Sequence, residues 1–178
     1  MIKIICLADY GHHFLSFAEL ICGLIELTIK NIQMTHAHNY EVDVNWIEDR
    51  IGILYSPDLN DEMHVATPPQ FPKGIEKIWS PEHLFTAAVN SCLMTTFLSI
   101  AENSKLEFTK FTSKAYGKLE TVEGKYLMTE IKLMPCLTIA KEEDREKALR
   151  ILNKSEAACL ISNSIRSKIT MEPTIRIA

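Results

Sequence analysis

The strongest constraint on the fold is a long apolar helix, predicted from Ser80 to about Asn103. Ser80 is a residue type that caps helix N-termini, Pro81 suits the first helical position, and Glu82 favours the positive end of the helix dipole. The segment that follows is apolar on nearly all sides, as expected of a helix at the centre of a domain. The rest of the chain must therefore supply elements that pack around this helix.

Strand candidates flank the helix on both sides. Before it, residues 40–46 alternate between apolar and polar and predict a half-buried strand. IGILYS and MHVAT predict two further short strands. After the helix, residues 108–121 and 125–139 predict two long strands.

The C-terminal part of the chain adds helices and one more strand. The turn residues Glu123-Gly124 predict a hairpin between the two long strands. KEEDREKALRILNKS predicts an amphipathic helix, SEAACLISNSI a shorter helix that begins at Ser155, and residues 169–177 a last strand. Because strands come in runs with helices grouped between them, the sequence predicts an α+β fold.

The length of 178 residues suits one domain with an extension. Ordered alternation begins after Met34, so we expect an N-terminal extension at residues 1–33 and a compact domain at residues 34–178. The extension contains FLSFAELICGLIEL, whose glutamates leave it short of the roughly 20 apolar residues of a membrane span. Lys and Arg are scattered and the net charge is -4, so we expect neither a nucleic acid nor a membrane as partner.

Five cysteines occur in the chain, at positions 6, 22, 92, 136 and 159. Their number is odd and none form a CxxC pair, which disfavours both a disulfide framework and a structural zinc site. The sequence therefore predicts a protein of the reducing cytoplasm, with no metal and no cofactor.

Taken singly, the candidate functional residues have ordinary structural explanations. Free cysteine is among the most buried residue types, so Cys92 and Cys159 are each more commonly inert core residues. Glu82 suits the helix dipole, and Arg50 suits a solvated turn. A cysteine hydrolase that uses His83 and Cys92 is disfavoured, because a straight helix separates these residues by about 14 Å.

Considered together, several segments resemble the OsmC/Ohr family, the osmotically induced and organic-hydroperoxide-resistance proteins. WIEDRIGIL is similar to the arginine-bearing turn of that family, and PPQF followed by WSPEHLFTAAVNSC is similar to its loop and first central helix. AACLISNSI is similar to the helix that carries the second cysteine of the family. The segments occur in the family's order, and the resemblance covers about residues 38–177.

The resemblance implies a fold and a set of roles. The implied fold has antiparallel sheets wrapped around two central helices, in an intertwined homodimer. Cys92 corresponds to the peroxidatic cysteine and Cys159 to the resolving cysteine. Arg50 corresponds to the arginine that activates the thiolate, and Glu82 to the carboxylate that orients this arginine.

The implied activity is that of a thiol-dependent hydroperoxide reductase. It would reduce organic hydroperoxides, with hydrogen peroxide as a further candidate, through a Cys92 sulfenic acid that Cys159 resolves. An external dithiol, for which a lipoyl-type compound is one candidate, would reopen the disulfide. The alternative is a non-catalytic stress-associated or small-ligand-binding protein on the same fold. Glu48-Asp49 and Leu160 depart from the pattern of the hydroperoxide-resistance branch and leave the branch open.

Helix geometry places Glu82 far from Cys92 within one chain. A rise of about 1.5 Å per residue puts Glu82 roughly 15 Å from Cys92 along a straight helix, and about 80° around its axis. Arg50 and Glu82 therefore do not easily reach the thiol of their own chain. Packing of the helix beside its two-fold mate can bring one chain's pair to the other chain's Cys92, so we predict an obligate dimer with composite active sites.

Overall fold

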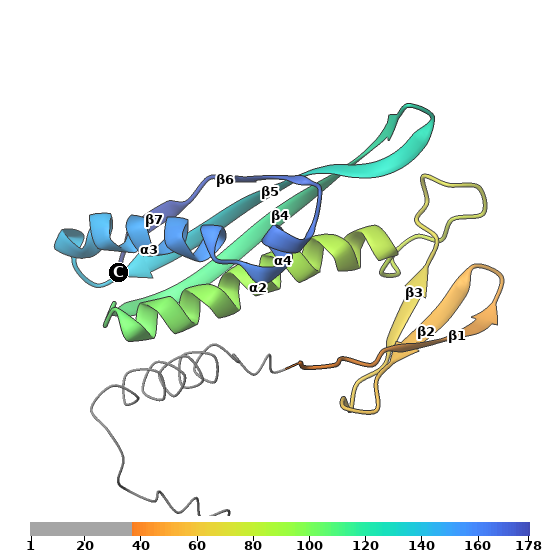
Figure 1. Ribbon diagram of the computed structural model, residues 1–178, viewed down its shortest axis with the longest axis horizontal. Helices are drawn as coiled ribbons and strands as arrows, with labels where there is room; N and C mark the ends of the chain where they lie inside the picture. Colours follow the sequence, from red (N-terminus) through yellow and green to blue (C-terminus); the bar gives the residue numbers. More distant parts are fainter. Residues whose placement is uncertain (1–36) are drawn as a thin grey trace, which may run out of the picture. The chain divides into compact units, whose positions relative to one another are not determined.

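The structure, a computed structural model, describes residues 37–178 (Figure 1). Most of this part forms one compact unit, Glu41–Ala178. The predicted extension at residues 1–33, the predicted boundary at Met34, and two cysteines, Cys6 and Cys22, lie outside the described residues.

The first three strands form an antiparallel sheet in the order β1-β2-β3. Their bounds are Asp43–Glu48 for β1, Ile51–Tyr55 for β2 and Met63–Ala66 for β3. The first strand is present, but the prediction that it is half-buried is wrong for the single chain, since its burial does not alternate. Val44 and Trp46 are 63% and 75% exposed, and every residue of β1 after Asp43 is exposed.

The second sheet is built on a long hairpin of β4 (Phe108–Val122) and β5 (Lys125–Ile139). Glu123 and Gly124 both have positive φ, as a two-residue hairpin turn with the correct twist requires. The hairpin prediction is therefore confirmed.

The last strand is divided in two, which corrects the sequence prediction. Residues 168–177 form β6 (Lys168–Met171) and β7 (Thr174–Ile177), with Pro173 between them. Proline cannot donate a ladder hydrogen bond, so it breaks the strand at this point. Both pieces pair with β5 in parallel, because the chain returns to the sheet through helices, and the second sheet is therefore mixed, not purely antiparallel.

The predicted central helix is confirmed as α2, Pro81–Asn103, with Ser80 as its N-cap. The C-terminal helices differ from the prediction. A short 3₁₀ turn, Glu142–Asp144, leads into α3, Arg145–Ala157, which continues through Ser155 where a new helix was expected. The chain breaks only at Ala158 and Cys159, and α4 follows at Leu160–Ser164.

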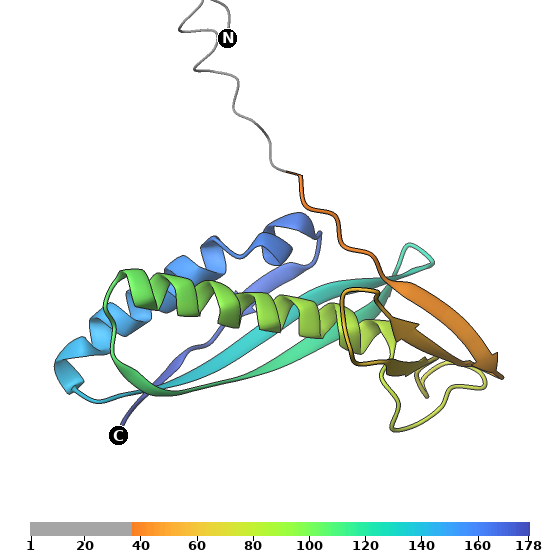
Figure 2. The same cartoon turned by 90° about the horizontal axis from the view of Figure 1, so that it is seen from below.

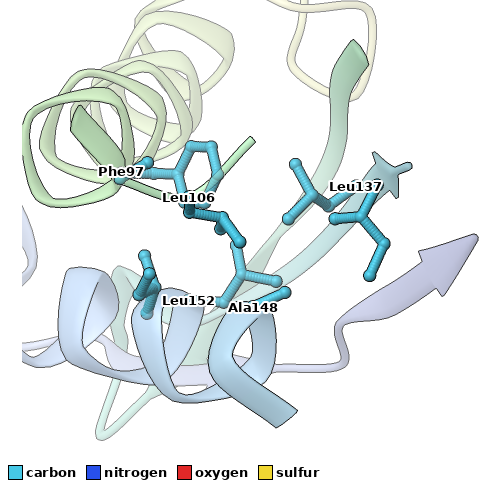
Figure 3. Close-up of a cluster of buried hydrophobic side chains, with 8 residues drawn as sticks. Phe97, Leu106, Leu137, Ala148 and Leu152 are labelled. Carbon is cyan, nitrogen blue, oxygen red and sulfur yellow. The ribbon is translucent and has the colours of Figure 1, made fainter. Parts of the chain in front are cut away.

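Helices α2 and α3 pack side by side against one face of the second sheet (Figures 1 and 2). Phe97 of α2 stacks on Phe111 and meets Phe108 edge-on, with ring centroids 4.9 and 5.2 Å apart. Figure 3 shows the core cluster between the helices and the sheet, with Phe97, Leu106, Leu137, Ala148 and Leu152. This layered arrangement with both antiparallel and parallel pairs is an α+β fold, as predicted.

Two features hold α2 close to β4. A Cβ atom at Gly117 would lie 2.2 Å from the Thr86 hydroxyl oxygen, so only glycine permits this approach. Ser113 donates a hydrogen bond of 2.6 Å to the side-chain oxygen of Asn90. These contacts fix the helix along the strand and thereby the direction in which Cys92 points.

By length and composition alone, α2 is long and apolar enough to cross a bilayer. Core helices of globular domains meet the same criterion. Here Val89, Leu93, Phe97 and Ala101 of α2 are fully buried in the core of the domain. Other apolar side chains of the helix, Met94 and Leu98, are 39% and 42% exposed. The single chain therefore covers only one side of an apolar helix.

Candidate functional site

Cys92 lies in the middle of α2 and points toward the break between α3 and α4. Cys159 occupies that break as the N-cap residue of α4, with no exposed surface, whereas Cys92 is half-buried. The two thiols are neighbours, since each is among the groups that shift the pKa of the other. The structure therefore brings together the two cysteines that the sequence singled out, although Cys159 lies before a helix and not within one.

The surroundings of Cys92 favour its thiolate. Burial by itself raises the pKa of the Cys92 thiol. Hydrogen bonds outweigh burial, and the pKa is lowered overall. In decreasing order of effect, the groups that lower the pKa are the Cys159 thiol, the backbone N–H of Ile161, the Thr96 hydroxyl and the backbone N–H of Leu160.

The surroundings of Cys159 have the opposite effect. Burial raises the pKa of the Cys159 thiol, and the hydrogen bond to Cys92 raises it further. The hydroxyl and backbone N–H of Ser162 lower it by less. The two sulfurs are thus unequal, with a thiolate favoured on Cys92 and a neutral thiol on Cys159.

The third described cysteine, Cys136, lies on β5 between Pro135 and Leu137. Those two neighbours are buried on the helix-covered face of the sheet. Because successive strand residues point to opposite faces, Cys136 points away from α2 and from the thiol pair. It is not placed to form a disulfide with Cys92.

Arg50 and Glu82 lie apart from the thiol pair. Arg50 lies in the β1–β2 turn, is exposed, and its carbonyl accepts a hydrogen bond from the backbone N–H of Thr67. Glu82 lies in the first turn of α2. Both residues line a cavity of about 650 Å³ together with Trp46, Phe71 and Pro81. The ion pairs found among residues 37–178 do not include one between Arg50 and Glu82.

One oxygen of the Glu82 carboxylate, Oε2, is buried without a hydrogen-bond partner among the described residues. A buried carboxylate oxygen is expensive to leave unpaired, so such an atom calls for a donor. Cys92 lies on the same helix but does not line the cavity of Arg50 and Glu82. Within one chain, the four predicted site residues therefore form two separate pairs.

Sequence reasoning missed the hydroxyl groups beside the two sulfurs. Thr96 Oγ1 lies 4.0 Å from Cys92 Sγ, and the Ser162 hydroxyl adjoins Cys159. The signal for Thr96 was its spacing of one helical turn from Cys92, which places both side chains on one face. In the part of the chain that the structure describes, no three His, Cys, Asp or Glu side chains are arranged to hold a metal ion.

The chain is similar in fold to several solved structures. An OsmC-like protein of unknown function from Vibrio cholerae superposes with a TM-score of 0.70 at 21% identity, over 77% of this chain and 99% of that one. An organic hydroperoxide resistance protein from Elizabethkingia anophelis gives a TM-score of 0.65 at 20% identity, over 82% and 100% of the two chains. A hydroperoxide resistance protein OsmC from Legionella pneumophila gives 0.62 at 18% identity, over 80% and 99%.

Sequence comparison gives the family. An uncharacterised Bacillus subtilis protein, YmaD, is 21% identical over 140 residues, which are 76% of this chain and 91% of the relative. The sequence model of the family described as OsmC-like protein matches residues 74–174, more than half of the chain. That match contains α2 with its capped N-terminus, the β4–β5 hairpin and both cysteines of the thiol pair, and it shows that the chain belongs to the OsmC-like family.

Proposed function

We propose that the protein is a thiol-dependent hydroperoxide reductase that uses Cys92 and Cys159 as a redox pair. The observation that carries this proposal is the placement of two free thiols as neighbours, with the partly exposed Cys92 on α2 and the buried Cys159 in the α3–α4 break. A peroxidatic cysteine must be a thiolate, and its resolving partner must lie within reach. Structural relatives named for organic hydroperoxide resistance support the same activity.

The first step consumes the hydroperoxide. The Cys92 thiolate attacks the terminal oxygen of R–O–O–H, the O–O bond breaks, and Cys92 becomes a sulfenic acid. The alkoxide that leaves takes up a proton and departs as the alcohol. In this step the sulfur is oxidised by two electrons and the peroxide is reduced by two.

The second step forms the disulfide. The Cys159 sulfur attacks the Cys92 sulfenic sulfur, the S–O bond breaks, and hydroxide leaves with the thiol proton as water. Oxidation removes the negative charge from Cys92, and that charge is one of the causes that raise the pKa of Cys159. Ionisation of Cys159 therefore becomes easier at the step that requires it.

Arg50 and Glu82 complete the proposed site from a second copy of the chain. A guanidinium supplies donors for the peroxide oxygens and for the charge on the leaving alkoxide, and the free Glu82 oxygen can fix its orientation. A homodimer would also cover the exposed apolar side chains of the single chain, which include Val44, Trp46, Trp79, Met94 and Leu98. The predicted intertwined dimer accounts for both the divided site and the uncovered surface.

The remaining partners follow from the chemistry. Reduction of the Cys92–Cys159 disulfide needs an external dithiol, which becomes a disulfide itself, and a lipoyl-type compound has that chemistry. We place the protein in the cytoplasm, where cysteines remain reduced, and the described cysteines Cys92, Cys136 and Cys159 are all free.

The experiment that tests the proposal adds one equivalent of hydroperoxide to the reduced protein and counts titratable thiols. Loss of two thiols per chain within seconds is expected, together with one equivalent of alcohol. A panel of hydrogen peroxide, alkyl and fatty-acid hydroperoxides then ranks the substrates by rate. A protein whose thiols persist against every peroxide of the panel is not a peroxidase, and the non-catalytic interpretation would replace this one.

A further inference from the structure

Thr96 differs from three other hydroxyl side chains of α2. Thr86, Ser91 and Thr95 donate to main-chain carbonyls of the preceding turn, at 2.8, 3.2 and 3.1 Å. Such bonds are the ordinary behaviour of serine and threonine in helices. The hydroxyl of Thr96 instead faces the sulfur of Cys92 at 4.0 Å.

Which group donates the hydrogen bond between Thr96 and Cys92 depends on the charge of the sulfur. With a neutral thiol, either group can be the donor. Once the thiol has lost its proton, the sulfur only accepts, and the Thr96 hydroxyl must donate. Because a hydrogen bond to a charged acceptor is stronger than one to a neutral acceptor, the hydroxyl favours the thiolate.

The groups that shift the pKa of Cys92 are all uncharged in the reduced protein. They are the Cys159 thiol, which faces it from the α3–α4 break, the Thr96 hydroxyl on α2, and the backbone N–H groups of Leu160 and Ile161. Cys159 is the one titratable group among them, and no charged side chain of residues 37–178 contributes. The thiolate is therefore favoured without help from Arg50.

We propose that Thr96 is a positioning residue that holds Cys92 as a thiolate within its own chain, before any guanidinium approaches. The contribution of Thr96 to catalysis rests on the proposed peroxidase function, whereas its effect on the ionisation of Cys92 does not. In the proposed site, Thr96 and Arg50 then have separate roles. Thr96 and its neutral neighbours prepare the nucleophile, and Arg50 binds the peroxide and stabilises the leaving oxygen.

The test is the pKa of Cys92 in the full-length protein and in Thr96→Val. The rate of alkylation by iodoacetamide is measured as a function of pH, and Cys92 is followed by peptide mass spectrometry so that the other cysteines do not contribute. Loss of the hydroxyl is expected to raise the Cys92 pKa by about half a unit to one unit. At a pH well below the pKa, this rise lowers the fraction of Cys92 present as thiolate by about threefold to tenfold. Thr96→Ser should restore the parent value, and Thr96→Ala provides a second deletion in case valine disturbs the helix.

Thr95→Val is the matched control, since it removes a hydroxyl from the adjacent residue, which bonds only the Cys92 carbonyl. It should leave the Cys92 pKa unchanged, and Arg50→Ala should keep this pKa below the ordinary cysteine value of about 8.5. An unchanged pKa in both Thr96→Val and Thr96→Ala, or an equal rise in Thr95→Val, overturns the inference. If the Thr96 variants shift the pKa but the parent protein consumes no hydroperoxide, the inference stands and the proposed function fails.

Discussion

Around Cys92, the single chain supplies the Thr96 hydroxyl and the backbone N–H groups of Leu160 and Ile161, whereas around Arg50 and Glu82 it leaves a buried carboxylate oxygen unpaired. The thiol pair is enclosed by α2 and the α3–α4 break, which pack on the main core. Arg50 stands exposed beside a cavity at the β1–β2 turn. Under the proposed function, one chain would prepare the nucleophile, while the groups that would handle the peroxide would need a partner chain.

The largest effect is expected from the thiol pair. Cys92→Ser should abolish peroxide turnover, because it removes the proposed nucleophile, a partly exposed thiol whose pKa is lowered. Cys159→Ser should still allow one round of oxidation, which stops at the sulfenic acid. Stopped-flow consumption of an alkyl hydroperoxide and a sulfenic-acid trapping reagent distinguish the two outcomes. Continued turnover of Cys92→Ser would move the chemistry to another residue.

The next prediction concerns the region of Arg50 and Glu82. Arg50→Ala and Cys92→Ser should each be inactive, and refolding the two variants together should recover part of the activity. Composite sites predict this result, because some heterodimers carry one intact site with Arg50 from one chain and Cys92 from the other. Each variant refolded alone is the control. An active protein that is monomeric by light scattering at micromolar concentration would contradict the composite site.

A stability measurement separates the core from the exposed sheet. Phe97→Ala should lower the free energy of unfolding by about 3–5 kcal/mol, since Phe97 is fully buried between aromatic rings. Trp46→Ala should change the stability of the isolated chain by less than about 0.5 kcal/mol, because Trp46 is 75% exposed. In the dimer, Trp46→Ala should weaken self-association at least about tenfold, as loss of a buried tryptophan at an interface does. Analytical ultracentrifugation and urea unfolding provide the two readouts.

The smallest effect is a difference in pH dependence between the two sulfurs. The alkylation rate of Cys92 should reach half its maximum below the pH typical of cysteine, because its pKa is lowered, and that of Cys159 above it, because its pKa is raised. Site-resolved alkylation from pH 5 to 10 measures both midpoints. Denatured protein is the control, and its cysteines should titrate together near about 8.5. If Cys92 and Cys159 have the same alkylation midpoint in the folded protein, the proposed difference in pKa between the nucleophile and its partner is wrong.

Local sequence signals predicted most of the fold. The capping residues at Ser80 and Pro81 and the Glu123-Gly124 turn act on their own neighbours, so α2 and the β4–β5 hairpin were predicted correctly. The break at Cys159 was not, because the helical pattern of the sequence continues through it. The parallel pairing of β6 and β7 also escaped prediction, since it depends on how the preceding helices return the chain to the sheet.

The candidate site also has residues that the sequence predicted and residues that it did not. The resemblance of local motifs singled out Cys92 and Cys159, and the structure brings them together. Thr96 and Ser162 were missed, because threonine and serine are common in helices and only the fold shows which of them face a sulfur. The joining of Arg50 and Glu82 to Cys92 remains a prediction, since it depends on a second chain.

Mapping the disulfide after mild oxidation tests whether Cys92 and Cys159 form one redox pair. The reduced full-length protein is treated with one equivalent of hydroperoxide, blocked with an alkylating reagent at low pH, digested and analysed by mass spectrometry without reduction. We expect a peptide pair joined through Cys92 and Cys159 within one chain, with Cys136 alkylated. A crosslink from Cys136 to either cysteine, or a Cys92 sulfenic acid that persists with Cys159 still a free thiol, would contradict it.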